Sequence, residues 1–225
     1  MGPGARVSGI AGMVAGLLLI FETSFFLLSG WSPPRFADPS LAMDLIRQGG
    51  DDLRAAAVFG FVGLIATVLL LAGLAEALQV NARACAAGQL YLGLVGVAGH
   101  SLVPLTLWIG VPAFRDLAAK SPSLAQSGWA GFAPISNGAH GVSSLFLGCS
   151  MVLAGAGLAQ GRGWSRWAGG LGVAAGGLTL ATLLTAGTPL EAAAGALFMP
   201  SLALTVLFRF LAGVALWRGA LQKVA

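Results

Sequence analysis

Apolar residues in this chain gather into six long runs, and most charged residues lie in the short segments between them. Each run can cross a lipid bilayer as a helix, because about 20 apolar residues rising ~1.5 Å each span the ~30 Å hydrocarbon core. The pattern therefore predicts an all-α polytopic membrane protein, a bundle of six transmembrane helices joined by short loops. The predicted spans cover residues 7–30, 54–79, 86–112, 131–157, 166–187 and 194–217.

Composition agrees with a membrane protein. Hydrophobic residues make up 57% of the 225 positions and charged residues 9%, whereas a soluble domain carries about 25% charged residues. No segment between the runs is long enough to bury a core of its own, so residues 1–225 are predicted to form one integral membrane domain with the lipid bilayer as its partner. The net charge of +4 is scattered without a basic run, and nucleic acid is therefore not expected as a partner.

The longest connecting segment, residues 31–53, predicts a short helix. Asp38 and Pro39 are typical of an N-cap followed by proline at the first helical position, and Gly49-Gly50 predicts the end of the helix. Its apolar face would consist of Leu41, Leu45 and Ile46. An amphipathic helix on the outer membrane surface is the plain interpretation, and a lid over a cavity is the functional one.

Charges near the span ends predict the orientation. One side of the predicted bundle has six basic residues and one acid, which are Arg6, Arg83, Arg162, Arg166, Arg218, Lys223 and Glu76. The other side has five basic residues and six acids, which are Arg35, Arg47, Arg54, Arg115, Lys120, Asp38, Asp44, Asp51, Asp52, Asp116 and Glu191. Because basic residues favour the cytoplasmic side, both termini are predicted to be cytoplasmic.

Glycines recur at helical spacing on several spans. They would form close-packing faces at Gly9, Gly12 and Gly16, at Gly93 and Gly96, and at Gly169, Gly172 and Gly176. Small residues let helices approach each other closely where lipid supplies no hydrophobic driving force. The same faces predict either packing within the bundle or contact with a second copy or a membrane-protein partner.

Four ionisable residues lie inside the predicted spans: Glu22, His100, His140 and Arg209. An ionisable group in hydrocarbon costs several kcal/mol unless it is neutral, paired or beside a wet cavity, so each marks a candidate functional position. With each span centred on the bilayer, Glu22, His100 and His140 fall in one layer on the outer side of the midplane, about 2–6 Å from it. Arg209 falls about 5 Å on the inner side, and Glu22 and Arg209 are predicted either to form a buried pair or to act separately.

Polar residues on the third and fourth spans add to this layer. At 100° per residue, the fourth span has an arc of about 120° that is predicted to face the bundle interior and contains Ser136, Asn137, His140, Ser143 and Ser144. On the third span, Gln89 and His100 share a face, and Pro104 removes the amide that would bond the carbonyl of His100. The candidate buried polar or transport residues are Glu22, Gln89, His100, Asn137, His140, Ser144 and Arg209. The alternative is that these side chains only form interhelical hydrogen bonds, each worth about 0.6–2 kcal/mol.

Several segments resemble an uncharacterised bacterial family of six-span integral membrane proteins. They are the opening AGMVAGLLLI, the loop DPSLAMDLIRQGGDDLRAA, the segment RWAGGLGVAAGG and the closing FMPSLALTVLFRFLAGVALWRG. The resemblance covers nearly the whole chain and implies a compact bundle in the bacterial inner membrane. It implies no activity and assigns no functional residue.

The sequence leaves several functions open. A membrane subunit or sensor would use the bundle for packing around a buried polar layer, and a small transporter or permease would use Glu22, His100 and His140 as a midplane site for a proton or substrate. A haem or metal protein would use His100 and His140 as ligands, because neutral imidazoles on facing helices suit both. No nucleophile–base pair, metal signature or phosphate motif of an enzyme is present, so an enzyme is not favoured.

Overall fold

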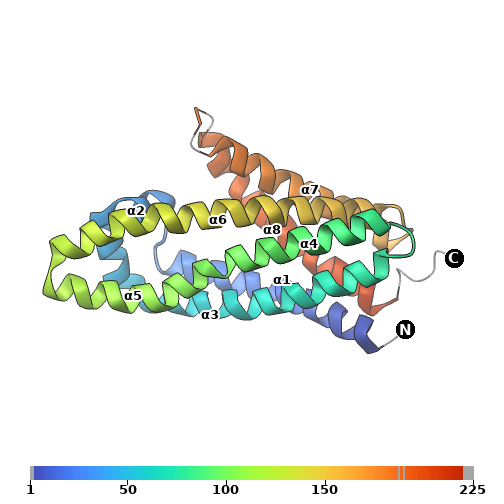
Figure 1. Ribbon diagram of the computed structural model, residues 1–225, viewed down its shortest axis with the longest axis horizontal. Helices are drawn as coiled ribbons and strands as arrows, with labels where there is room; N and C mark the ends of the chain where they lie inside the picture. Colours follow the sequence, from blue (N-terminus) through green and yellow to red (C-terminus); the bar gives the residue numbers. More distant parts are fainter. Residues whose placement is uncertain (1–2, 187, 190, 220–225) are drawn as a thin grey trace. The chain divides into compact units, whose positions relative to one another are not determined.

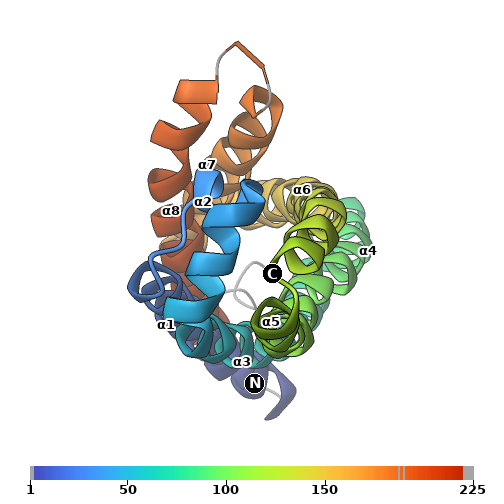
Figure 2. The same ribbon diagram turned by 90° about the vertical axis from the view of Figure 1, so that its left-hand side faces the viewer.

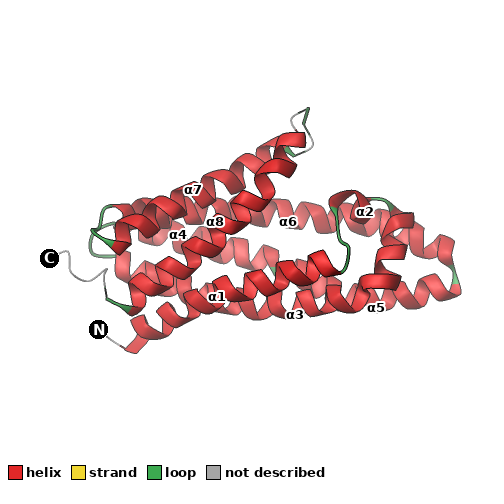
Figure 3. Ribbon diagram, turned by 180° about the vertical axis from the view of Figure 1, so that it is seen from behind, coloured by secondary structure: helices red, strands yellow, loops and turns green. Residues whose placement is uncertain are grey.

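The computed structural model describes residues 3–186, 188–189 and 191–219, and all regular structure in this part of the chain is helical (Figure 3). The helices in chain order are α1 (Pro3–Leu28), α2 (Pro33–Ala37), α3 (Pro39–Leu78), α4 (Arg83–His100), α5 (Leu102–Lys120), α6 (Pro122–Ala159), α7 (Trp164–Thr185) and α8 (Glu191–Trp217) (Figure 1). Lys223, which contributed to the predicted orientation, lies outside the described residues.

Six helical segments are long and apolar enough to cross a membrane, which confirms the predicted all-α polytopic bundle. The segment Arg83–Lys120 counts as one of them, although it is divided into α4 and α5 at Ser101. Two of the spans belong to helices of 40 and 38 residues, α3 and α6. A helix of this length measures about 60 Å, twice the hydrocarbon core, so both helices must extend well beyond the bilayer.

The predicted helix end at Gly49-Gly50 is wrong, since α3 continues through both glycines. Gly49 packs directly on Ser29, whose carbonyl would collide with a Cβ at position 49, and a Cβ at Gly50 would lie 2.5 Å from Nη2 of Arg115. These glycines therefore permit close contacts instead of ending the helix. The predicted start is correct, because Oδ1 of Asp38 accepts hydrogen bonds from the backbone amides of Ser40 (2.8 Å) and Leu41 (3.0 Å).

The chain divides into two compact units. The first unit comprises residues 1–17, 63–98 and 142–225, and the second unit comprises residues 18–62 and 99–141. The second unit thus contains α2, α5, the N-terminal part of α3 and the C-terminal end of α1, together with the N-terminal half of α6.

Helices of the first unit approach each other through glycines, as the sequence predicts. A Cβ at Gly9 of α1 would lie 2.6 Å from the backbone nitrogen of Trp217 in α8, and a Cβ at Gly155 of α6 would lie 2.7 Å from the carbonyl oxygen of Gly169 in α7. Helices α7 and α8 lie side by side in the same unit (Figure 2). The glycine faces of α1, α4 and α7 are therefore occupied by other helices of the same chain.

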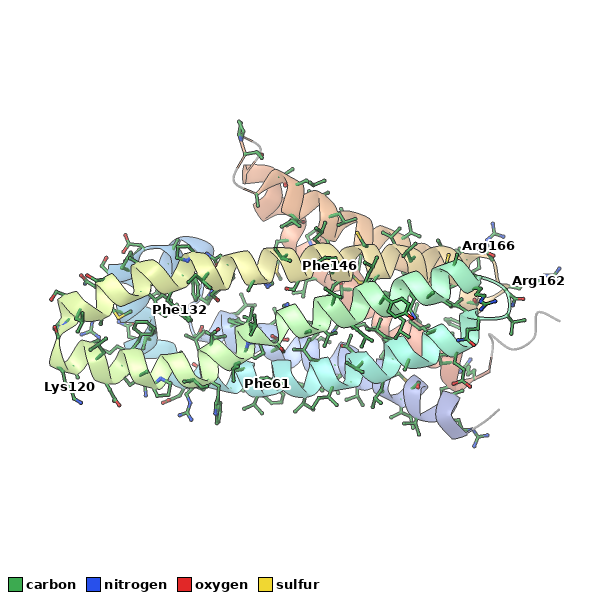
Figure 4. The ribbon with its side chains drawn as sticks, viewed as in Figure 1. Phe61, Lys120, Phe132, Phe146, Arg162 and Arg166 are labelled. Carbon is green, nitrogen blue, oxygen red and sulfur yellow. The ribbon has the colours of Figure 1, made fainter. Side chains whose placement is uncertain are left out.

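Aromatic residues build the core of the second unit. Trp129 of α6 is 2% exposed and packs edge-on against Phe36 and Phe114, with ring centroids 4.9 and 5.1 Å away. Its indole nitrogen donates a hydrogen bond of 2.8 Å to the carbonyl oxygen of Phe36. Phe132 lies beside the same cluster on α6, with its ring 5.6 Å from that of Phe114 on α5 (Figure 4). Around this cluster the remaining buried residues are aliphatic, among them Leu45, Ile46 and Leu53.

Candidate functional site

A broken helix lies at the centre of the candidate site. His100 is the last residue of α4, and α5 begins at Leu102. Pro104 has no amide hydrogen, so the carbonyl of His100 loses the donor that an unbroken helix would supply, and Leu105 donates only a long bond of 3.3 Å to the carbonyl of Ser101. Pro104 itself is fully buried.

The two histidines of the chain meet beside this break. The imidazole rings of His100 and His140 have centroids 5.2 Å apart and planes inclined by 54°. His100 is half-buried at the end of α4, and His140 is exposed on α6. The prediction that these residues face each other is therefore confirmed.

Glu22 of α1 belongs to the second unit, as do the two histidines. Its side chain is half-buried and lies over Gly60 of α3, where a Cβ would be 2.8 Å from Oε1 and 3.2 Å from Cδ of the carboxyl group. Pro104 lies within 4 Å of the same point. Gly60 thus leaves room for the carboxyl group next to the residue that breaks the helix.

Only one edge of the polar arc of α6 is buried. Ser136 and Ser143, at one edge of the arc, are 8% and 1% exposed. Ser144 is half-buried, and Asn137, at the other edge, is exposed. The prediction of an interior position is therefore correct for Ser136 and Ser143 and wrong for Asn137, because the helices packed against α6 bury only part of its polar face.

Gln89 is fully buried, but it lies in the first unit and serves there as a link between helices. Its amide nitrogen donates to the carbonyl oxygen of Leu71 on α3 (2.9 Å), and its own backbone carbonyl accepts from the hydroxyl of Ser150 on α6 (2.7 Å). Three helices are thus joined at one residue, as expected if Gln89 serves only to form interhelical hydrogen bonds.

Arg209 is half-buried on α8 and belongs to the first unit, whereas Glu22 belongs to the second. Its backbone carbonyl lies on the glycine face of α1, where a Cβ at Gly12 would be 3.1 Å away. The predicted pair between Glu22 and Arg209 stays a prediction.

A metal site at the histidines would have two protein ligands. Imidazole nitrogens bind Zn²⁺ at about 2.0–2.1 Å, and the observed ring separation suits two ligands on one ion. Four-coordinate sites need more, and no group of three or more His, Cys, Asp or Glu side chains within the described ranges is placed to hold an ion. A haem between the histidines would require the two rings to move apart, since the iron and its macrocycle would lie between them.

Sequence reasoning missed the roles of Gly60 and Ser101. A single glycine in an apolar run has no feature that distinguishes contact with a carboxyl group from ordinary packing. Ser101 marks the break only when the proline three residues later is considered together with the histidine before it. Also missed was the stacking of Arg54 on Trp108, which joins residues 54 positions apart.

No family model, curated protein or solved structure matches this chain. The class is therefore defined by the fold: a multi-pass helical membrane protein. Within its second unit, two histidines and a glutamate lie around a broken helix.

Proposed function

We propose that this chain is a small transporter or permease that binds a proton, or a small polar substrate coupled to one, at Glu22, His100 and His140. The observation that carries the proposal is the break between α4 and α5, with His100 at its edge, His140 against it and the carboxyl group of Glu22 beside Pro104. Discontinuous helices supply binding groups in many transporters, because the interrupted backbone presents carbonyl groups that a regular helix would use internally.

The side chains at the break suit proton exchange. Imidazole changes its charge near neutral pH, and carboxyl groups inside membrane domains serve as relays in pumps and transporters. Residues kept only for packing need no ionisable group inside a membrane-spanning helix, since serine or asparagine would form the same interhelical bonds at a lower desolvation cost.

The first experiment measures proton binding directly. Since the sequence contains two histidines, protein labelled with ¹⁵N in histidine gives two sets of imidazole NMR signals, which His100→Phe and His140→Phe assign. We expect the titration midpoints of the histidines to depend on each other and to change in Glu22→Gln. Glu76→Gln, which removes an exposed acid of α3 in the first unit, is the matched control and should leave both midpoints unchanged.

The second experiment measures movement of protons. Proteoliposomes containing a pH-sensitive dye should acidify faster than empty liposomes under an imposed pH gradient, and Glu22→Gln should lose this difference while keeping its melting temperature in detergent. If the two histidines titrate independently, and Glu22→Gln leaves their titration midpoints unchanged, the proposed site is wrong. If the histidine titrations are coupled but no proton flux is measured, the result would instead favour a membrane subunit or sensor.

A membrane subunit or sensor is the second candidate, and the charged end of the second unit, residues 31–53 and 113–130, favours it. This end carries Arg35, Arg47, Arg115 and Lys120 together with five aspartates, and its helices continue beyond the length that a bilayer can cover. Proton binding at the histidines would then change how this chain binds a membrane-protein partner or a second copy of itself. Such a partner would have to use a surface other than the glycine faces of α1, α4 and α7, which are filled within the chain.

The location proposed for this protein is the bacterial inner membrane, with both termini in the cytoplasm. The support comes from the distribution of basic residues over the two sides, from the even number of spans and from the family resemblance. A cytoplasm-active and a periplasm-active reporter fused after Ala225 test the orientation. Signal from the periplasmic reporter alone would refute it.

A further inference from the structure

Two helices of the second unit change from polar to apolar surfaces at the same place. On α3, the exposed side chains in the two turns before Arg54 are polar, namely Arg47, Gln48 and Asp51, whereas Val58 and Val62 in the two turns after it are exposed and apolar. On α5 the order is reversed, from Leu105 and Ile109 to Asp116 and Lys120. A membrane protein shows such a change where its surface passes from lipid tails to headgroups and water.

Arg54 and Trp108 meet at this boundary. The guanidinium carbon of Arg54 lies 4.5 Å from the ring centroid of Trp108, which is 42% exposed. Tryptophan is enriched at the headgroup level of membrane proteins, because its ring is apolar and its indole nitrogen is a donor. A guanidinium placed over an aromatic ring keeps its N–H groups in its own plane, where they can donate to a planar acceptor.

Arg54 differs from the other three arginines of its unit in its partners. Arg115 bonds to Asp51 (3.2 Å) and to the carbonyl oxygen of Ile46 (3.3 Å), Arg35 bonds to the carbonyl oxygen of Gly30, and Arg47 pairs with Asp44. For half-buried Arg54, the part of the chain that the structure describes offers neither a carboxylate nor a hydrogen-bond acceptor, and Nε is buried without one. The acids nearest to Arg54 in sequence do not pair with it, since Asp51 is bound to Arg115 and Asp52 makes no ion pair with any described residue.

We propose that Arg54, held against Trp108, binds the phosphate group of a membrane phospholipid. Desolvating a guanidinium without an acceptor is unfavourable, and a phosphate accepts two parallel N–H bonds from its planar edge. Exposed apolar side chains lie on the membrane side of the pair, including Val58 and Leu105, and these suit an acyl chain attached to that phosphate. This combination of a cation and an apolar flank selects a lipid over a soluble anion.

Native mass spectrometry of the full, delipidated chain in detergent tests this site. Phosphatidylglycerol is added to the protein, and diacylglycerol with the same acyl chains serves as the ligand without phosphate. We expect wild-type protein to retain one phosphatidylglycerol in preference to diacylglycerol, and Arg54→Gln to weaken this binding by about 10-fold or more. Arg47→Gln removes the same charge from the exposed face of α3 two turns earlier and should bind as wild type does.

Two further variants keep the test decisive. Trp108→Leu should weaken binding several-fold, because the guanidinium loses the ring that orients it. If Arg54→Gln does not fold, Arg54→Lys keeps the charge without the planar fork and should also bind less lipid than wild type. Equal binding by wild type and the Arg54 variants would overturn the proposal. Displacement of the lipid by millimolar inorganic phosphate would show a site for free anions and would overturn its assignment to a lipid.

Discussion

The two units of this protein differ in what fills most of their helix contacts. In the first unit, helices meet backbone to backbone through glycines, as at Gly155 and Gly169, and the buried side chains are mainly alanine and leucine. In the second unit, helices meet through large rings around Trp129 and through polar links such as that between Arg115 and Asp51. The first unit thus depends more on residues without a side chain at its helix contacts, and the second unit depends more on large side chains that fill the space between helices.

The difference indicates where each region finds its stability. Within lipid, apolar side chains gain little by moving from tails to a helix interface, so close van der Waals approach between small residues decides the packing. Outside lipid, burial of aromatic surface from water is strongly favourable. The ring cluster around Trp129 lies in the unit that carries the charged segments 31–53 and 113–130, and burial of its aromatic surface is the main stabilising contribution expected there.

The largest expected effect is at the aromatic cluster. Trp129→Ala removes a ring that is 2% exposed and its hydrogen bond to Phe36, and we expect a loss of about 3–5 kcal/mol in stability. Trp167→Ala, at a ring that is 75% exposed in the first unit, is the control and should change little. Melting in detergent, followed by circular dichroism, measures both, and equal effects would erase the distinction between the units.

Next in size is the glycine contact between α6 and α7. A Cβ at Gly155 would lie 2.5 Å from the backbone nitrogen of Val173, which cannot move without the helix, so Gly155→Ala should cost about 1–3 kcal/mol. Gly170→Ala lies on α7 with open space around it and should be neutral or slightly stabilising through helix propensity. The same melting measurement applies, and a harmless Gly155→Ala would show that the helices of the first unit are not held by close approach.

A smaller effect is expected at the polar link of the first unit. Gln89→Met keeps the length of the side chain and removes the bond to the carbonyl of Leu71, and it also removes an amide oxygen that is buried without a partner. We expect a net loss of only about 0.5–1 kcal/mol, because the two effects oppose each other. Gln126→Met, on the exposed face of α6, is the control. A loss as large as that of Trp129→Ala would mean that polar bonds, and not glycines, stabilise this unit.

The smallest effect concerns the start of α3 in the second unit. The hydrogen bond from the side chain of Ser40, with those from the amides of Leu41 and Ser40, lowers the pKa of Asp38 below its usual 3.8. The cap therefore stabilises the helix fully above pH ~4 and is lost as the pH falls through the lower pKa of the folded state. Hydrogen exchange at the amides of residues 40 and 41 should accelerate in Asp38→Ala at neutral pH. Asp116→Ala, an exposed acid on α5, should leave this exchange unchanged.

Much of the fold could be predicted from local sequence. The six spans, the N-cap at Asp38 and the disturbance that Pro104 causes at His100 each depend on residues within one or two helical turns. The glycine faces were predicted for a similar reason, because helical spacing alone places Gly9, Gly12 and Gly16 on one side. These features follow from the transfer of side chains to lipid and from backbone chemistry, and neither requires knowledge of a partner helix.

Tertiary structure alone decided the remainder. Gly49-Gly50 has the composition of a helix end, yet α3 continues there because Ser29 and Arg115 occupy the space beside it. Equally, the spacing on α6 defined a polar arc, but packing buried Ser143 and left Asn137 exposed. The neighbours of Glu22 and the stacking of Arg54 on Trp108 depend on how each helix is rotated and how far it slides along the next. Hydropathy fixes that a helix lies in the membrane, whereas its rotation and register are fixed by contacts between residues distant in sequence, which local patterns do not specify.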